Sequence, residues 1–441
     1  MYRKALPWAL AWAWAFVAHA QTVPASAVAV PVKDTLPPIS PDNVIGRTAA
    51  GTFVEPPTAL TLAEATEYAL AGNAELSVAA REIGALEGAR LQGSLRPNPE
   101  LGVQVEDLRD RNRNTTFELS QRIERGGKRE ARMALAEAGQ GVATKDFLAR
   151  ERALRAQVTA AFRTVQGAQE NLRLAEASLE LAAQVSQLAA KRVQAGKVSP
   201  VEETRARLAE AATRAERAGA EGALQIMRAR LSTLWGNPLP RFTAAEGPAA
   251  SAEALPPLPS LLARLDEAPL MDRARAEIGR RRAAVDMERS RGVQDVTVSA
   301  GVRRNEELGL NQVLFGISIP LAVNDRNQGG LLEALRRTDQ AEDEMSALRM
   351  QLAERLVASH QRAQVARELA RTLEQDILPG AQSAHRAAVT GFELGKFTFL
   401  EVLDAQRTLF QARSQYVRAL TDMHEALADI QAVIGDRVNG Q

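Results

Sequence analysis

The sequence contains no cysteine among its 441 residues. It therefore forms no disulfide bond, carries no cysteine-linked lipid and builds no cysteine-ligated metal centre. Histidine is nearly as scarce, and His360, His385 and His424 stand too far apart in the sequence to suggest a ligand set. We accordingly expect no catalytic residue, no cofactor and no bound metal.

Aromatic residues and net charge are also scarce. Phe, Tyr and Trp make up only 4% of the chain, which is low for a globule with an aromatic core. The 55 basic residues nearly balance the 54 acidic ones, and a net charge of +1 provides no surface for nucleic acid. Alanine, arginine, leucine, glutamate and glutamine are abundant instead, and that composition favours long helices.

The one long apolar run lies at the N-terminus. Arg3 and Lys4 precede the apolar stretch 5–17, and Ala18-His19-Ala20 matches a small-x-small cleavage site. This pattern predicts a secretory signal peptide over residues 1–20, with a retained membrane anchor as the alternative. No later apolar run is long enough for a membrane-spanning helix, so any membrane contact would have to be made by strands.

Three landmarks recur in order at a near-constant spacing. Leu119-Ser120 is followed 198 positions later by Ile317-Ser318. Gly196-Lys197 and Trp235-Gly236 each have a counterpart 199 positions later. Such spacing indicates an internal duplication. The predicted organisation is a signal peptide (1–20), an extended proline-rich surface arm (21–60), a first repeat (61–236), a proline-rich connector (237–259), a second repeat (260–435) and a short tail (436–441).

Each repeat is expected to contain two short strands followed by a long helix. Alternating apolar and polar residues predict strands at about 101–108 and 115–124, and again at about 295–303 and 312–321. Residues 128–195 contain no proline, and a helix of that length spans about 100 Å. The matching helix over 330–391 should be kinked or interrupted at Pro379.

The apolar residues of the long helices follow seams. In the first long helix, one seam has a 3.5-residue period, the spacing found in coiled coils; it comprises Val158, Ala161, Val165, Ala168, Leu172, Ala175, Leu179 and Ala182. The helix predicted over 399–435 has two seams, one through Leu403 and Phe410 and one through Val402 and Leu409. Two seams favour a helix with neighbours on both sides, as in the wall of a tube, over one half-buried in an ordinary bundle.

Four strands cannot close a membrane barrel, and open strand edges are not tolerated in lipid. The strands must therefore be completed by further copies. Two copies would give a barrel filled by its own side chains, whereas three would leave a lumen. The expected fold is mainly α with a small β part, in which duplicated helix–hairpin–long-helix units form, as a trimer, a twelve-stranded outer-membrane β-barrel continued by a periplasmic α-helical barrel.

Two sequence segments strengthen this interpretation. Residues 95–101 (Leu-Arg-Pro-Asn-Pro-Glu-Leu) lead into the first strand, and residues 118–129 run from the second strand into the long helix. With the duplicated order over roughly 60–435, they resemble the TolC family of outer-membrane factors, and in particular its cobalt–zinc–cadmium resistance branch. The resemblance implies the passive outer-membrane channel of a tripartite RND-type efflux system, with a long periplasmic extension.

The same resemblance implies cargo, partners and site residues. The cargo would be heavy-metal cations such as Co, Zn, Cd or Ni, delivered by an inner-membrane RND pump and a periplasmic adaptor (membrane fusion protein) to a homotrimer seated in outer-membrane lipid. The adaptor would dock on two helical tips, near 196–200 and 392–400, comprising Gly196, Lys197, Val198, Ser199, Gly395, Lys396, Phe397 and Thr398. Glu401, Asp404 and Glu202 match the acidic positions of the family's pore constriction.

Carboxylates repeated around a pore would select cations, although helix-start carboxylates stabilised by the helix dipole are the simpler alternative.

The chain departs from the family at the tips. Phe392 and Phe397 occupy the places where better-known members use a tyrosine and an arginine to hold the channel shut. Glu202 matches the acidic partner of that lock, and Lys396 is a neighbouring cation that would substitute for the arginine.

Two alternative functions remain at this stage. The same channel would serve equally for drugs or organic solutes, because a duct of this kind is generic. A soluble periplasmic coiled-coil tether is the other, although it would not need hairpins of membrane length.

Overall fold

The computed structural model describes residues 55–107, 113–247 and 255–435. The predicted signal peptide, the predicted arm up to residue 54, the first hairpin tip at 108–112, residues 248–254 of the connector and the tail at 436–441 lie outside these ranges. All described residues belong to one compact unit.

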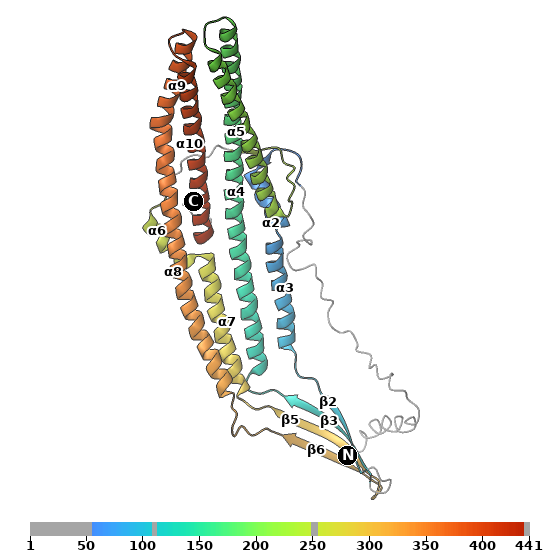
Figure 1. The fold of residues 1–441 in the computed structure, drawn as a ribbon. Coiled ribbons are helices and arrows are strands. Elements are labelled where there is room, and N and C mark those ends of the chain that lie inside the picture. The colour runs from blue at the N-terminus through green and yellow to red at the C-terminus, as the bar shows by residue number, and fades with distance from the viewer. Residues whose placement is uncertain (1–54, 108–112, 248–254, 436–441) are drawn as a thin grey trace, which may run out of the picture. The chain divides into compact units, whose positions relative to one another are not determined.

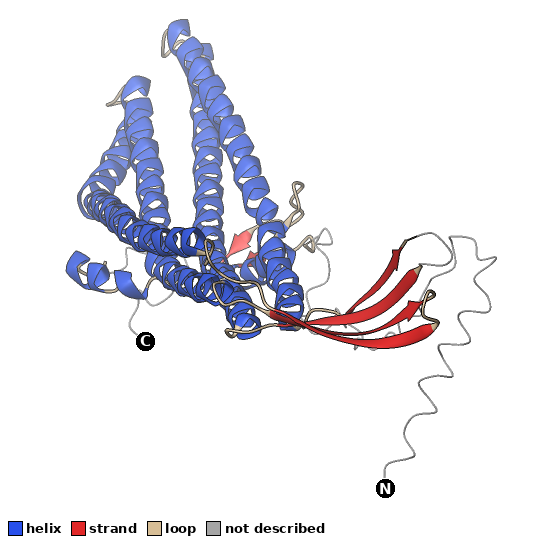
Figure 2. Cartoon of the chain, turned by 90° about the horizontal axis from the view of Figure 1, so that it is seen from below, coloured by secondary structure: helices blue, strands red, loops and turns tan. Residues whose placement is uncertain are grey.

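Four strands form one antiparallel sheet in the order β2-β3-β5-β6 (Figure 2). They are β2 (Glu100–Glu106), β3 (Asn114–Ile123), β5 (Val296–Asn305) and β6 (Leu310–Ser318). All four lie within three residues of the ranges that the alternation predicts. The two hairpins join through β3 and β5. Among the described strands, β2 and β6 therefore form the two outer edges of the sheet, each with a partner on one side only.

The register of this sheet places apolar side chains in rows on one face. Val103 lies opposite Phe117, Phe117 opposite Val302, and Val302 opposite Val313. These side chains are exposed, and Phe315 on the same face is 84% exposed. The other face carries mainly small and polar residues, with Leu314 opposite Gly301 as an apolar exception. At Gly301 on that face, a Cβ would lie 2.6 Å from the carbonyl oxygen of Phe117.

Two helical columns run from the sheet to two chain reversals (Figure 1). The first is α4 (Lys128–Gln194), whose 67 residues span about 100 Å. The second consists of α8 (Gln328–Thr372), a five-residue π turn (Leu373–Ile377) and α9 (Leu378–Glu393). The predicted interruption at Pro379 is thus a bulge in a continuous helix and not a break.

The shorter helices lie end to end along these two columns (Figure 1). Both α3 (Ala74–Ser94) and α5 (Pro200–Ser232) pack on α4. Both α7 (Pro269–Arg291) and α10 (Phe399–Ile434) pack between α4 and α8. The two-sided packing that the seams predict for α10 is therefore confirmed.

Side-chain bonds tie α10 to both neighbours. On one side, Thr164 of α4 donates to Glu425 at 2.9 Å. On the other, Arg362 of α8 donates to Asp429 at 2.6 Å. Within the described ranges, no helix has the length and apolar content needed to cross a membrane.

The segments 95–101 and 118–129 build the junction between sheet and helices. The guanidinium of Arg132, just beyond the second segment, pairs with the Glu124 carboxylate and donates to the carbonyl of Leu95 at 3.1 Å. Lys128 pairs with Asp295 at 2.7 Å and so links α4 to β5. Gly126 has φ +70°, and a Cβ there would lie 2.6 Å from the Val293 side chain. The sequence of segments 95–101 and 118–129 is therefore explained by the contacts that join the sheet to the start of α4.

A second small sheet and several short elements surround the middle of α4. Strand β1 (Leu60–Thr61) pairs in parallel with β4 (Ala245–Glu246), next to α2 (Leu62–Gly72) and the 3-10 turn η2 (Thr233–Trp235). The main apolar core centres here on the fully buried Trp235. A second core joins α6 (Leu258–Ala263) and η3 (Leu265–Glu267) to α8 and α10.

The end of the predicted surface arm is packed into this region. Glu55 is fully buried, and its carboxylate accepts three hydrogen bonds. They come from Trp235 Nε1 at 3.0 Å, Asn237 Nδ2 at 2.7 Å and the backbone N–H of Arg241 at 2.6 Å. Residues 55–61 and the start of the connector, residues 237–246, are therefore packed beside the middle of α4. The prolines of both segments suggest extended surface segments instead, and for these residues that prediction is wrong.

These bonds decide the ionisation of Glu55. Burial acts to raise the pKa of its carboxyl, but the donors from Arg241, Asn237 and Trp235 outweigh burial and hold the pKa below its ordinary value of 4.5. Because the folded-state pKa is lowered, the charged form adds stability above the ordinary value. That contribution is lost as the pH falls through the folded-state pKa.

Replacing Glu55 with alanine should lower the free energy of unfolding by at least about 2 kcal/mol, because several buried donors lose their acceptor. Thermal unfolding followed by circular dichroism in detergent measures this. Glu67→Ala, at an exposed position of α2, is the matched control and should change little. Glu55→Gln should lose the part of the acid-side dependence of stability that the Glu55 carboxyl contributes, and should retain the part contributed by Glu124, Glu277 and Asp295, whose pKa values are also lowered. Equal unfolding midpoints for the Glu55→Ala and Glu67→Ala variants would contradict a structural role for this carboxylate.

Candidate functional site

The two reversals lie together at the end of the helices farthest from the large sheet (Figure 1). At the first, Gly196 has φ +67°, a left-handed conformation that glycine adopts without strain. Lys197 N–H then bonds back to the carbonyl of Arg192 at 2.9 Å. Ser199 caps α5 through a 3.3 Å bond from the backbone N–H of Val201, and Pro200 occupies the first helical turn. Each of these residue types is one that ends or begins a helix.

The second reversal repeats this geometry. Gly395 has φ +72°, and Lys396 N–H bonds to the carbonyl of Gly391 at 2.8 Å. Thr398 caps α10. The Glu401 carboxylate accepts from the Thr398 N–H at 2.6 Å and from its hydroxyl at 2.9 Å, which forms a capping box. The two glycines named from the sequence are therefore both in the conformation that the reversals require.

A small apolar cluster holds the two reversals together. It combines residues of all four helices and is rich in alanine: Val185, Ala189, Ala206, Ala388, Phe392 and Val402. Farther from the reversals, Gln406 of α10 donates to the carbonyl of Ser178 in α4 at 3.0 Å. Small side chains let helices approach closely but bury little apolar surface each.

The predicted constriction residues differ in their surroundings. Glu401 and Asp404 are exposed near the start of α10, and Glu401 is engaged in the capping box. Glu202 is half-buried in the first turn of α5. In the described part of the chain, no ion pair joins Glu202 to Lys396. The substitute lock suggested by the sequence is therefore not formed here.

Phe392 and Phe397, which stand where better-known family members have a tyrosine and an arginine, make different contacts. Phe397 packs back on its own hairpin, where a Cβ on Gly391 would lie 2.2 Å from its ring. Phe392 is only 5% exposed and meets Arg192 of the other hairpin. The guanidinium carbon of Arg192 lies 4.1 Å from the Phe392 ring centroid, and its Nη2 donates to the Phe392 carbonyl at 3.0 Å.

Sequence reasoning missed Arg192. It stands one residue after Lys191 in a helix that carries many arginines, and nothing in the pattern marks it.

The histidines likewise lie outside the reversals. Burial, aided by the nearby Arg413, lowers the pKa of His385. Within the described ranges, no group of three or more His, Cys, Asp or Glu side chains is arranged to hold a metal ion.

The family model for outer membrane efflux proteins matches residues 66–237 and 262–436. The chain belongs to this family. The predicted channel function and the predicted location, in the outer membrane with a long periplasmic extension, are confirmed, and the soluble tether is excluded. The two matched segments leave out the proline-rich residues between them.

Individual proteins show the same relationship. The chain is 42% identical to the cobalt-zinc-cadmium resistance protein CzcC of Cupriavidus metallidurans, over 90% of this chain and 96% of that protein. It is 30% identical to the nickel-cobalt-cadmium resistance protein NccC of Alcaligenes xylosoxydans, over 54% of each. The open-state outer membrane channel MtrE of Neisseria gonorrhoeae superposes with a TM-score of 0.70 at 19% identity, covering 85% of this chain and 88% of that one.

These comparisons confirm the predicted fold class, mainly α with a small β part, as that of an outer-membrane channel. The likeness to MtrE at 19% identity concerns the fold alone, while the nearly full-length match to CzcC places the chain beside a metal-resistance protein. The resemblance to the TolC family and to its cobalt–zinc–cadmium branch, which rested on residues 95–101 and 118–129, is confirmed as well.

Proposed function

We propose that this channel exports heavy-metal cations such as Co, Zn, Cd or Ni. The observation that carries the proposal is the 42% identity to a cobalt-zinc-cadmium resistance protein over nearly the full length of both chains. The channel conducts passively and does not act as an enzyme, and cargo selection lies in the pump that feeds it.

We propose a homotrimer as the working form. Support comes from the outer edges of the sheet, β2 and β6, and from the exposed apolar row that they flank. Three copies of four strands close a twelve-stranded barrel that leaves a lumen, and lipid covers the apolar face. The long helices then continue the wall of the barrel into the periplasm.

A periplasmic adaptor and an RND pump are the proposed partners. The adaptor docks on the two reversals, where exposed groups surround Gly196 and Gly395. Val201, Leu394 and Leu400 are large apolar side chains that stand exposed beside these glycines. Exposed apolar groups on an otherwise charged helical surface are typical of a protein-binding site.

Glu401, Asp404 and Glu202 are the residues that we propose line the pore constriction. Both α10 carboxylates are exposed in the described chain, and three copies would gather six of them around the axis. A ring of carboxylates attracts cations and repels anions. The Glu401 side chain that completes the capping box is exposed, so the same group serves the helix start and the pore.

Deletion of this gene should raise sensitivity to Co²⁺, Zn²⁺ and Cd²⁺ severalfold, because cations that the pump captures lose their exit. Minimum inhibitory concentrations measure this, with the wild-type gene restored on a plasmid as the control. Sensitivity to hydrophobic drugs should stay unchanged. Loss of drug resistance with unaltered metal resistance would assign the channel to organic solutes instead.

Neutralising the constriction as Glu401→Gln with Asp404→Asn should reduce the cation preference of the channel. It should also weaken block by multivalent cations added from the periplasmic side, because the field at the pore is lost. Glutamine retains the capping box, so the helix start is preserved and the charge alone is tested. Single-channel recordings in planar bilayers provide the measurement.

Two control variants accompany the single-channel recordings of the Glu401→Gln, Asp404→Asn protein. Glu203→Gln removes a carboxylate that is paired with Arg207 on α5 and should leave ion preference as in wild type. Glu401→Ala removes the Glu401 half of the capping box as well as the carboxylate, and should also loosen the start of α10. Unchanged ion selectivity and block in the Glu401→Gln, Asp404→Asn protein would remove both residues from the pore.

A further inference from the structure

The apolar alternation of β6 continues beyond the end of the strand. Residues 319–327, here called the β6–α8 segment, connect β6 to α8, whereas the shorter residues 124–127 connect β3 to α4 and include no large apolar side chain. Every second residue from Val313 onward is apolar, and in the β6–α8 segment these residues are Ile319, Leu321 and Val323. Leu321 is 83% exposed and Val323 is 73% exposed.

The backbone of the β6–α8 segment is held in a defined shape. Val323 N–H bonds to the carbonyl of Leu321 at 2.9 Å, and Arg326 Nε donates to the carbonyl of Ala322 at 3.1 Å. Asn327 Nδ2 donates to the carbonyl of Glu288 in α7 at 2.8 Å. The two exposed apolar side chains are therefore presented by a backbone that is bonded to itself and to α7.

Strand length places this segment at the edge of the membrane. A tilted strand of about 9–11 residues crosses the hydrocarbon layer, and β6 has 9 residues. The segment follows β6 on the side where the helices begin, as Figure 1 shows, and those helices extend into the periplasm. The β6–α8 segment therefore lies where the acyl chains of the periplasmic leaflet meet their headgroups.

Arg326 adds a positive charge to the same segment. Its side chain is exposed, and the bond to Ala322 uses one of the five N–H donors of the guanidinium. Within the described ranges no carboxylate pairs with it. Asp325 accepts from the backbone N–H of Asn327 at 2.8 Å, while Arg289 and Arg291 pair with carboxylates of their own helix α7. A guanidinium with unused donors matches the geometry of a phosphate group.

A phospholipid fits both features of the segment. It presents acyl chains and a phosphate close together, as the segment presents Leu321 and Val323 close to Arg326. The apolar side chains also continue the exposed row of the sheet, which lipid covers in the proposed barrel. A neighbouring copy of the chain would cover the apolar side chains as well, but a second copy does not account for an exposed arginine without a carboxylate partner.

We propose that the β6–α8 segment is a lipid-binding site of the periplasmic leaflet. Leu321 and Val323 enter the acyl layer beside β6, and the guanidinium of Arg326 binds the phosphate of an anionic phospholipid. The site goes beyond the proposed cargo and partners and depends on neither. It rests on the proposed placement of the sheet in lipid.

Tryptophan quenching by brominated lipids tests the apolar contact. The full-length channel is reconstituted into phosphatidylglycerol vesicles whose acyl chains carry bromine either near the headgroup or near the chain end. Leu321→Trp should be quenched, and more strongly by bromine near the headgroup. Phe315→Trp, on the apolar face of the sheet, is the positive control. Leu239→Trp, at a 77% exposed position beside the middle of α4, should not be quenched, and neither should the fully buried Trp235 of wild type.

Native mass spectrometry in detergent tests the headgroup contact. With phosphatidylglycerol and phosphatidylcholine added in equal amounts, wild type should retain more phosphatidylglycerol. Arg326→Gln should lower the ratio of the two bound lipids by about fivefold, the effect of one cation beside an anionic headgroup. Arg326→Lys keeps the charge and should keep most of the preference.

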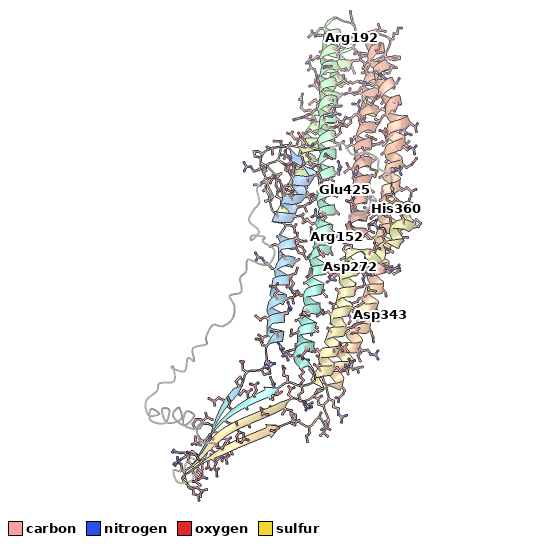
Figure 3. The ribbon with its side chains drawn as sticks, turned by 180° about the vertical axis from the view of Figure 1, so that it is seen from behind. Arg152, Arg192, Asp272, Asp343, His360 and Glu425 are labelled. Atoms are coloured by element: carbon pink, nitrogen blue, oxygen red, sulfur yellow. The ribbon has the colours of Figure 1, made fainter. Side chains whose placement is uncertain are left out.

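The control for charge lies farther from the sheet. Arg282 of α7 pairs with Glu342 of α8 at 3.0 Å. Glu342 precedes Asp343, which Figure 3 labels on α8 away from the sheet. Arg282→Gln also removes one exposed guanidinium, but it should leave the ratio of bound lipids as in wild type.

The outcomes separate the lipid site from the proposed barrel. If Phe315→Trp is not quenched, the sheet does not lie in lipid, and both the proposed barrel and the lipid site fail. If Phe315→Trp is quenched but Leu321→Trp is not, the lipid site alone is wrong. Blue-shifted emission from Leu321→Trp without quenching would then assign the segment to a contact between copies, and red-shifted emission would assign it to water. Equal lipid ratios in the Arg326→Gln and Arg282→Gln proteins would overturn the role of Arg326.

Discussion

The outer edges of the large sheet are the constraint on which the remaining structure depends. Strands β2 and β6 present unpaired backbone groups beside an exposed apolar face. In lipid each unpaired group costs several kcal/mol, so only a closed ring of strands is stable there. Four strands are too few to close, and the proposed trimer supplies the rest. Because α4 follows β3 and α8 follows β6 along the chain, closure of the ring of strands also determines where the helices stand.

The sheet is coupled to the distant reversals by one continuous wall. At the junction, Lys128, Arg132 and Asp295 bind the strands to the start of α4. From there α4 extends without interruption, whereas the second column contains the π turn. The first column is therefore continuous, whereas the second widens locally at the π turn. At the reversals, Arg192 of the first column stacks on Phe392 of the second.

Much of this structure was readable from the sequence because its signals are local. Period-two alternation predicted the strands, and Gly196 and Gly395 marked reversals that need a left-handed backbone. Glu55 was missed because it stands among prolines and its partners lie some 180 residues away. Arg192 was missed because its partner is on the other hairpin. Pro379 signalled an interruption, and the structure accommodates it as a π turn over Leu373–Ile377, just before α9.

Cysteine cross-linking across the sheet edges tests the central claim most directly, and the absence of native cysteine makes the background clean. A panel of proteins with one cysteine in β2 and one in β6 would be oxidised in the outer membrane and separated by mass. A closed trimer predicts a ladder of one, two and three cross-linked chains and no larger species. Cross-linking that stops at dimers, or that continues beyond three chains, would contradict it.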